Sequence, residues 1–482
     1  MTTIFEVEHL YQPDGWFSPG YLSVGDNGMI LSVSETPPEN DESTIRIPGF
    51  GVPGLANLHS HAFQRALAGR CESVSANPGT EDNLWTWRRA MYDLVGRMKP
   101  DQYEAIAAFV YLEMVKSGMT AVGEFHYVHH APGGERYDTL TEMSDRLISA
   151  AASVKIGITM LPVLYAHGGI GVPASEPQLR FTHSDVNSYL RLIEDLRNRH
   201  SDTQGVEIGM ALHSLRAVAS DEVHEAVAGL LAMDANSRIH IHVSETIHEV
   251  EEVQAGLGAR PVQWLLDNVD LNSQWTLVHA THLDSSEWTG LAASGAVAGI
   301  CPLTEATLGD GYFPLVEYHG AKGQWGIGTD SHYTTSIPKE LQILECGKRL
   351  QVGRRNVIAE PGHPLKSHSG RVLFDQALIG GEQSLAQQTG ALAPGYRADL
   401  VVLDSRSSTL LTHGTDTVLD AWLLSGTENS VKDVMIGGRW VVQDGSHPEE
   451  REIHSRYAAA MAELLKQADW KVTNSIFYPA CH

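Results

Sequence analysis

The chain has 482 residues, of which 42% are hydrophobic and 19% are charged, a composition typical of a globular protein with one large and at least one smaller domain. No apolar run approaches the roughly 20 residues of a membrane-spanning helix, and the N-terminus lacks the basic and apolar regions of a secretory signal. The formal net charge of −25 argues against nucleic acid and against anionic membranes as partners.

The cysteines and histidines of the chain indicate its compartment and the kind of chemistry it can carry out. The four cysteines lie far apart and form no CxxC pair, so we expect free thiols in a reducing compartment, the cytoplasm. The 24 histidines are a high count and a first sign of metal chemistry. The negative net charge opposes long-range attraction of an acidic substrate, so local arginines would have to bind one.

Residues 1–50 are expected to form short strands with a turn at residues 25–28. Eight apolar, β-branched runs follow, each ending in polar residues and followed by a helical stretch. These runs lie at residues 55–59, 120–126, 156–164, 206–213, 238–242, 275–279, 296–301 and 325–330. Buried strands that alternate with helices indicate a parallel sheet covered on both faces, and eight of them predict a closed (β/α)8 barrel over residues 51–375.

One of the intervening helices can be predicted in detail. After Pro100, Asp101 is expected to cap a helix, with Glu104 three residues later as the reciprocal partner. Tyr103 and the apolar residues that follow at helical spacing would form its buried face. Gly118 is expected to end this helix just before the second strand.

The C-terminal flank resembles the N-terminal one in its short strands. Residues 376–450 contain two apolar runs, at 398–404 and 434–442, and neither flank has enough apolar surface for its own core. We therefore expect an α/β protein, a TIM barrel with one small β-sandwich domain built from both chain ends. Residues 451–482 would form a C-terminal helix and tail, with the helix at 452–471 packed on the barrel exterior.

Side chains able to bind a metal occur at the ends of four predicted strands. Strand one ends in His59-Ser60-His61, and a spacing of two puts both imidazoles on one side of an extended chain. Strand five ends in His242, with Glu245 three residues later. Strands six and eight end in His279 and Asp330. In barrel enzymes the catalytic groups lie at the C-terminal strand ends, so these side chains should converge on one mouth.

Other readings of these residues remain open at this point. His240 lies on the same strand face as His242 and competes with it as a ligand, although His242 is nearer the strand end. Asp330 could merely cap a helix, a frequent use of aspartate. Cys301 also ends a strand, but the following Pro302 and the lack of a second thiolate favour a packing role. The three histidines after strand two are candidates for the pocket wall rather than for metal binding: His126, His129 and His130.

The pattern resembles the deaminase branch of the amidohydrolase superfamily, in which such residues hold one divalent ion, usually zinc. By position, the resemblance implies that the metal ligands are His59, His61, His242 and Asp330. It implies that Glu245 and His279 act on the bound water, and that Asp330 can accept a proton. Binuclear members have a lysine at the end of strand four; this chain has His213 there, which favours a single metal.

A closer similarity is to the formimidoylglutamate deiminases of histidine degradation. It rests on residues 57–66, 84–88, 124–130, 213–218, 304–311 and 328–332, and one departure is Ser244-Glu245-Thr246-Ile247, where we associate Ala-Glu-Gln with that family. The resemblance implies a homodimer that hydrolyses N-formimino-L-glutamate to N-formyl-L-glutamate and ammonia. Arg88 and Arg216 would bind the two substrate carboxylates, with three hydrogen-bonding neighbours: Gln64, Tyr127 and His213.

Two rival functions remain. A deaminase of a purine, pyrimidine or related heterocycle would use the same metal and Glu245, and would stack its substrate on Trp85, Trp87 or Tyr127. A non-catalytic scaffold would keep the barrel but would be expected to lose ligands, whereas every expected ligand is present. Arg88 also lies in an Arg88-Arg89 run that could be solvated surface.

Overall fold

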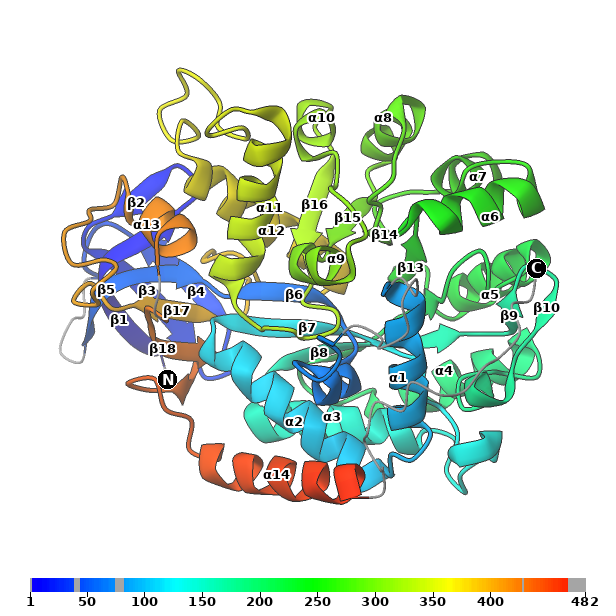
Figure 1. Cartoon of the computed structure of the whole chain (residues 1–482). Coiled ribbons are helices and arrows are strands. Elements are labelled where there is room, and N and C mark those ends of the chain that lie inside the picture. The colour runs from blue at the N-terminus through cyan, green and yellow to red at the C-terminus, as the bar shows by residue number, and fades with distance from the viewer. Residues whose placement is uncertain (1, 39–43, 74–81, 427–428, 467–482) are drawn as a thin grey trace.

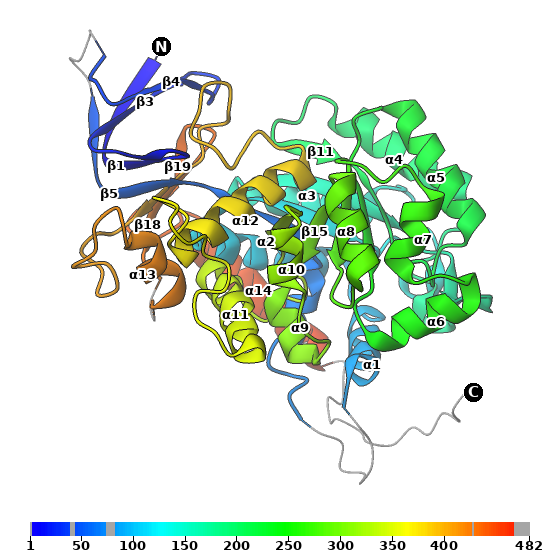
Figure 2. The same ribbon diagram turned by 90° about the horizontal axis from the view of Figure 1, so that it is seen from above.

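The computed structural model describes residues 2–38, 44–73, 82–426 and 429–466. Its larger part is a ring of parallel strands surrounded by helices, and a smaller sheet lies at one side of the ring (Figures 1 and 2). The strands of the ring, in chain order, are β6 (Leu55–Ser60), β7 (Met119–His126), β8 (Gly157–Leu164), β11 (Val206–Ile208), β12 (Met210–Leu212), β13 (Ile239–Val243), β14 (Trp275–His279), β15 (Val297–Ile300) and β16 (Gln324–Ile327).

The ring is the predicted (β/α)8 barrel. The fourth strand is divided into β11 and β12, both of which pair with β8, and all neighbouring strands pair in parallel. A parallel bridge between Ser60 and Asp330 joins the first and last strands. Every residue of β6, β7 and β8 is buried, as expected for strands packed on both faces. The fold prediction is therefore confirmed.

Helices lie between and after the barrel strands, and most of them cover the outside of the ring (Figures 1 and 2). They are α1 (Leu84–Val95), α2 (Pro100–Lys116), α3 (Glu142–Val154), α4 (Val186–His200), α5 (Ser220–Met233), α6 (Ile247–Leu257), α7 (Pro261–Asn268), α8 (Ser285–Ser294), α9 (Pro302–Leu308), α10 (Leu315–Gly320), α11 (Ile337–Val352) and α12 (Ser369–Leu385). A short 3-10 helix, η1 (Ala62–Leu67), directly follows the first strand.

The start of α2 differs from the prediction. Pro100 is the first helical residue and Lys99 caps the helix, because the Lys99 backbone N–H donates to Gln102 Oε1 at 3.0 Å. Asp101 therefore lies inside the first turn, and Glu104 instead accepts hydrogen bonds from Arg146 and Arg456. The predicted Asp101 cap is wrong by two residues, whereas the end of the helix, just before Gly118, is as expected.

The two chain ends meet in one eight-stranded sheet, as predicted for the small β-sandwich. Its strands are β1 (Thr2–Gln12), β2 (Gly15–Phe17), β3 (Gly20–Gly25), β4 (Ile30–Ser34), β5 (Ile45–Pro53), β17 (Leu400–Leu403), β18 (Val431–Ile436) and β19 (Arg439–Val442). The ends join where β5 pairs antiparallel with β17. Apolar residues from both ends, including Phe5, Val7, Leu400 and Val402, form one buried cluster. Figure 2 shows the two sets of strands side by side.

The C-terminal part of the chain returns to the barrel. Helix α12 contacts β6, β15 and β16, so the division predicted at residue 375 falls inside one barrel-packed helix, and we propose that the barrel extends to Leu385. After α13 (Val418–Leu424), helix α14 (Glu450–Lys466) packs on α2, as expected (Figure 1). The remainder of the helix predicted at 452–471 lies outside the described residues. Within the described ranges, no helix has the length and apolarity needed to cross a membrane.

Candidate active site

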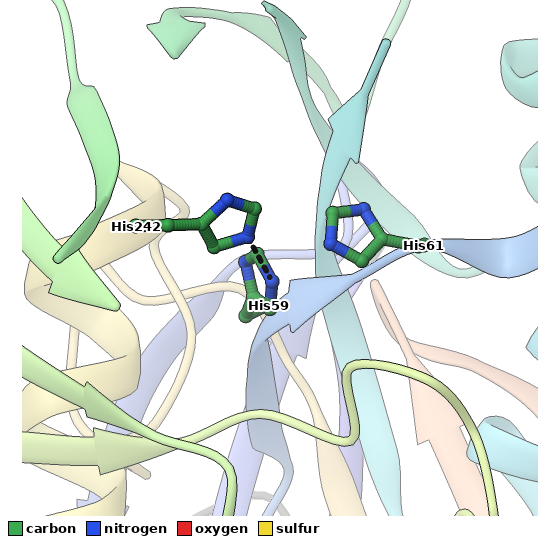
Figure 3. A group of neighbouring side chains, drawn as sticks. All are labelled: His59, His61 and His242. Carbon is green, nitrogen blue, oxygen red and sulfur yellow. Dashed lines mark hydrogen bonds between the residues drawn. The ribbon is translucent and has the colours of Figure 1, made fainter. Parts of the chain in front are cut away.

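Three histidines from two strands turn their rings toward one another at the barrel mouth (Figure 3). Nε2 of His59 lies 3.2 Å from Nε2 of His242. Oδ1 of Asp330 lies 3.4 Å from Nε2 of His59 and 3.3 Å from Nε2 of His61. Two ligands of a tetrahedral zinc ion, each about 2.0–2.1 Å from the metal, are about 3.3 Å apart. The spacing of these four side chains therefore fits one tetrahedral ion.

Hydrogen bonds and burial prepare the three imidazoles for metal binding. Nδ1 of His61 lies 2.7 Å from the carbonyl oxygen of Phe125, and Nδ1 of His242 lies 3.0 Å from that of His213. Because each Nδ1–H donates to a carbonyl, each Nε2 lone pair is left for a ligand. Burial lowers the pKa of His59 to about 3 and also lowers those of His61 and His242. The rings are thus neutral, as metal binding requires.

The closure of the barrel holds these candidate ligands in place. The backbone N–H of Asp330 donates to the carbonyl oxygen of His59 at 3.0 Å, and the N–H of His61 donates to that of Asp330 at 3.1 Å. Beneath them, Asn57 exchanges two hydrogen bonds with Thr329, and the Ser60 hydroxyl donates to Glu124. The HxH segment and the aspartate are therefore fixed by the same contacts that close the ring.

Backbone strain is concentrated at the same mouth. Five non-glycine residues there have positive φ, between 45° and 70°: Ser244, His279, Ala280, Asp330 and His332. Such a conformation costs of order 1–3 kcal/mol per residue and is typically found at functional sites. It occurs at His279, the last residue of β14, and at Asp330, three residues after β16, and both of these side chains line the pocket.

Glu245 and His279 lie together beside the candidate ligands. Oε1 of Glu245 is 3.6 Å from Nε2 of His279, and Oδ2 of Asp330 is 4.0 Å from the same nitrogen. Burial raises the pKa of Glu245 above its usual range, against the effect of His279. Burial alone would lower the pKa of His279, but Glu245, Glu305 and Asp330 raise it to about 10. The pair can therefore hold and transfer a proton at this position.

The loop that carries Glu245 is held by the helix that follows it. The backbone N–H groups of Ser244 and Glu245 donate to the carboxylate of Glu249, at 3.2 and 3.0 Å. Glu249 itself lies in the first turn of α6, where the Thr246 hydroxyl accepts its N–H. The carboxylate of Glu249 thus positions the backbone of Glu245, and it is buried at 2% exposure.

A pocket opens in front of these groups. Ten of the eleven residues that the sequence predicted for the site line it: His61, Gln64, Arg88, Tyr127, His213, Arg216, His242, Glu245, His279 and Asp330. The remaining one, His59, is fully buried beneath the pocket. Nε2 of Gln64 donates to the Tyr127 hydroxyl at 2.8 Å. The structure therefore brings the predicted catalytic and substrate-binding residues to one cavity.

The two arginines lie on the pocket wall without a carboxylate partner. Arg88 donates to the Tyr165 hydroxyl at 2.9 Å, and Nε of Arg216 is buried without a hydrogen bond. The indole of Trp85 lies between them, 5.4 Å from the Arg88 guanidinium carbon and 5.5 Å from that of Arg216. In the described part of the chain, neither arginine forms an ion pair. Two guanidinium groups at a pocket wall without a directly paired carboxylate favour an anionic ligand.

Several sequence candidates lie elsewhere. His240 lies 2.9 Å from the carbonyl oxygen of Ser384, away from the ligand cluster, and Trp85 is not part of the pocket wall, whereas Trp87 is. Cys301 is buried, in agreement with a packing role. None of the histidines after strand two lines the pocket; with His183 they form a separate buried group, hereafter the histidine cluster: His126, His129, His130 and His183.

Some pocket residues were not predicted. Tyr165 directly follows β8 and touches Arg88, so the strand-end rule that identified the other candidates would have found it. Thr304 and Ser331 also follow strands closely. Phe181, Met91 and Tyr92 reach the pocket from a loop and from α1, and no pattern in the sequence identifies them.

Comparison with known proteins identifies the family of the chain. A sequence model of the amidohydrolase family matches residues 50–441. The chain is 44% identical to a formimidoylglutamate deiminase of Pseudomonas aeruginosa, over 96% of this chain and 100% of that protein. An 8-oxoguanine deaminase of the same organism is 27% identical, over 95% and 97% of the two chains. The crystal structure of an amidohydrolase from Brucella melitensis superposes with a TM-score of 0.88, at 38% identity over 96% of this chain and 100% of that one. The chain therefore belongs to the amidohydrolase family.

Proposed function

We propose that this protein hydrolyses N-formimino-L-glutamate to N-formyl-L-glutamate and ammonia, with one divalent metal ion. The observation that carries the substrate class is the pair of arginines, Arg88 and Arg216, that face the pocket without a carboxylate partner among the described residues. A dicarboxylate would neutralise both. The name of the P. aeruginosa relative supports the same substrate.

The proposed metal ligands are His59, His61, His242 and Asp330, and the proposed ion is zinc, which prefers such a nitrogen and oxygen set in tetrahedral geometry. When bound, a divalent ion polarises water and can lower its pKa from about 15.7 to roughly 7. Three imidazoles held neutral and one carboxylate held ionised support this assignment.

The chain's own residues would carry the protons. Glu245 takes a proton from the attacking water as the new C–O bond forms at the formimino carbon. His279, whose Nε2 faces Glu245, orients the water and stabilises the tetrahedral carbon centre. With the formimino group bound as its cation, the tetrahedral carbon carries an NH2 group, and Glu245 then delivers its proton to that nitrogen as the C–N bond breaks and ammonia leaves. Asp330 would accept the second proton, from the hydroxyl group of the tetrahedral carbon, as the new C=O bond forms.

Substrate binding would use the other half of the pocket. Arg88 and Arg216 bind the two carboxylates, with Gln64, Tyr127 and His213 as hydrogen-bonding neighbours. The Tyr127–Gln64 hydrogen bond and the Arg88–Tyr165 hydrogen bond fix the donors before the substrate arrives. The negative net charge of the chain makes this local positive wall necessary.

The rival functions are weakened to different degrees. Membership of the amidohydrolase family argues against the non-catalytic scaffold, and so does the presence of all four candidate ligands. A heterocycle deaminase would use the same metal and Glu245, and Trp87 and Tyr127 line the pocket as it would require. Trp85 does not line the pocket, and the two arginines there favour a dicarboxylate instead. We also propose that the enzyme is a cytoplasmic homodimer, and light scattering of the purified protein would test the dimer.

The experiment that tests the proposal is ammonia release by zinc-loaded protein, with formiminoglutamate, guanine, cytosine and adenosine assayed in parallel. We expect turnover of formiminoglutamate alone, loss of turnover after chelation, and recovery with one zinc equivalent per chain. Turnover of a heterocycle instead would reject the dicarboxylate assignment of Arg88 and Arg216. Full activity in metal-free protein would reject the metal site.

A further inference from the structure

A second carboxylate lies on the far side of His279. Oε1 of Glu305 is 3.4 Å from Nδ1 of His279, while Nε2 of the same ring faces Glu245 at 3.6 Å. Glu305 lies in the first turn of α9, directly behind the pocket wall formed by Thr304 and Leu308, and it is 3% exposed. It does not itself line the pocket, so it can reach a substrate only through His279.

The carboxylate of Glu305 is held in a fixed position. Its Oε1 also accepts the backbone N–H of Cys301, the cap residue of α9, at 2.9 Å. One oxygen thus receives two donors, one from the helix start and one from the imidazole. His279 is the last residue of β14, where it pairs with Val243 of β13, and its backbone has a positive φ of 70°. The strand pairing fixes the backbone of His279, and the contact with Glu305 restrains its ring.

We propose that Glu305 is the positioning residue for His279. Its carboxylate accepts the Nδ1–H, which fixes the ring orientation and directs Nε2 at Glu245 and Asp330. This inference rests on the proposed role of His279 in the reaction. Nothing in the sequence pattern of strand-end residues assigns a role to Glu305, because it belongs to the helix after the seventh barrel strand.

Two other roles of the Glu305 carboxylate must be distinguished from the positioning of His279. Glu305 could serve only to cap α9, or it could form a second metal site, because His279, Cys301 and Glu305 place one donor atom each within 4.8 Å of the others. The chain supplies a matched control for the first use. Glu340 is also fully buried and accepts the backbone N–H of Leu303, in the first turn of the same helix, at 2.9 Å. The structure describes no contact between Glu340 and His279.

The test compares Glu305→Ala, Glu305→Gln and Glu340→Ala in the full-length, zinc-loaded enzyme, with whichever substrate the wild type deaminates. We expect Glu305→Ala to lower kcat by about 10- to 100-fold, the usual effect of losing a partner that orients a catalytic histidine, with KM unchanged within twofold. Glu305→Gln keeps an acceptor oxygen and should recover most of kcat. Glu340→Ala should retain kcat, and all variants should hold one zinc per chain.

A second measurement does not depend on turnover. In protein with ¹⁵N-labelled histidine, the Nδ1–H resonance of His279, identified by its absence in His279→Gln, should be lost in Glu305→Ala and kept in Glu340→Ala. Equal loss of kcat in Glu305→Ala and Glu340→Ala would assign Glu305 to helix capping and overturn the proposal. Loss of a second zinc equivalent in Glu305→Ala would overturn it in favour of a metal site. If the wild type turns over no formiminoglutamate, the proposed function fails while the resonance still decides the role of Glu305.

Discussion

Arg88 and Arg89 are neighbours on α1 with different surroundings. Arg88 lines the pocket and touches Tyr165, whereas Arg89 is exposed. If Arg88 binds a substrate carboxylate, Arg88→Met should lower kcat/KM for formiminoglutamate by about 30- to 5,000-fold, which corresponds to a loss of about 2–5 kcal/mol of binding. Steady-state kinetics would measure this, with Arg89→Met as the control that should leave kcat/KM unchanged. Similar behaviour of the two variants would remove Arg88 from the substrate site.

Glu245 can be tested by a change that keeps its size. Glu245→Gln removes the proton acceptor but leaves every proposed metal ligand intact, so kcat should fall by about 10²–10⁴-fold while the zinc content stays at one per chain. The control is Glu251→Gln, an exposed glutamate on α6. A Glu245→Gln variant with normal kcat would show that another group carries the proton.

At the residue scale, the sequence predicted those site residues that lie at or near strand ends. His59, His242 and Asp330 were identified because parallel strands all end at one mouth. The position of Glu305 could not be predicted, because it depends on how the first turn of α9 packs behind His279. Spacing along the chain gives no measure of such a contact between a helix and a neighbouring strand end.

At the scale of elements, the histidine cluster gives the fold a sensitivity to acid. Nδ1 of His129 and Nε2 of His126 and His183 are buried and have no hydrogen-bond partner among the described residues, and burial lowers the pKa of His129 to about 3. An unfolded histidine titrates near 6.5, so between pH 6.5 and 3 the unfolded chain binds more protons than the folded one. The free energy of unfolding should therefore fall as the pH drops through this window, by up to about 1.4 kcal/mol per pH unit for each such histidine.

Thermal or urea unfolding between pH 7 and 4 would measure this dependence. His129→Gln can still donate to the carbonyl oxygen of Val163 but cannot take up a proton, so the pH slope should be shallower than in the wild type. His224→Gln, at an exposed position on α5, is the control. An unchanged slope in His129→Gln would contradict the assignment.

The start of α2 illustrates what local patterns leave undecided. The sequence permits a cap at Asp101, but it also permits a helix that starts at Pro100. The structure has the second, with Lys99 extended at φ −90° and ψ 159°, the conformation favoured for a residue before proline. Giving that restriction more weight than the preference for aspartate caps would have placed the helix start correctly.

At the scale of the whole molecule, the small sheet and the barrel are joined by a group of polar contacts around Arg397, hereafter the node. Its guanidinium pairs with Asp399, which is 1% exposed, and donates to the carbonyl oxygen of Thr120 in β7 at 3.0 Å. Arg397→Met should lower the free energy of unfolding by about 3–5 kcal/mol, because it leaves a buried carboxylate unpaired. Arg406 also pairs with an aspartate two residues away, Asp404, but it is 76% exposed. Arg406→Met should therefore lower the free energy of unfolding by only about 0–1 kcal/mol.

Urea unfolding of the two variants would compare these values. Equal effects at both positions would show that the node does not join the two parts of the molecule. The architecture itself was predictable, because eight buried strands alternating with helices have few ways to pack. The assignment of α12 to the barrel was not predictable, because the sequence of a helix near a domain boundary does not show which domain it packs against.

The closure of the barrel, where the first and last strands meet at a seam, also affects the order of folding and metal binding during synthesis. Asn57 and Thr329, which hold the two sides of the seam, are 272 residues apart, and a ribosome needs roughly 15 to 50 s to add that many residues. Until then the nascent chain offers only part of the proposed ligand set, so the ion's full binding free energy becomes available only to a closed ring. An ion that binds after the ring has closed would hold the first and last strands together. In cells short of metal, we therefore expect faster amide hydrogen exchange to appear first along β6 and β16.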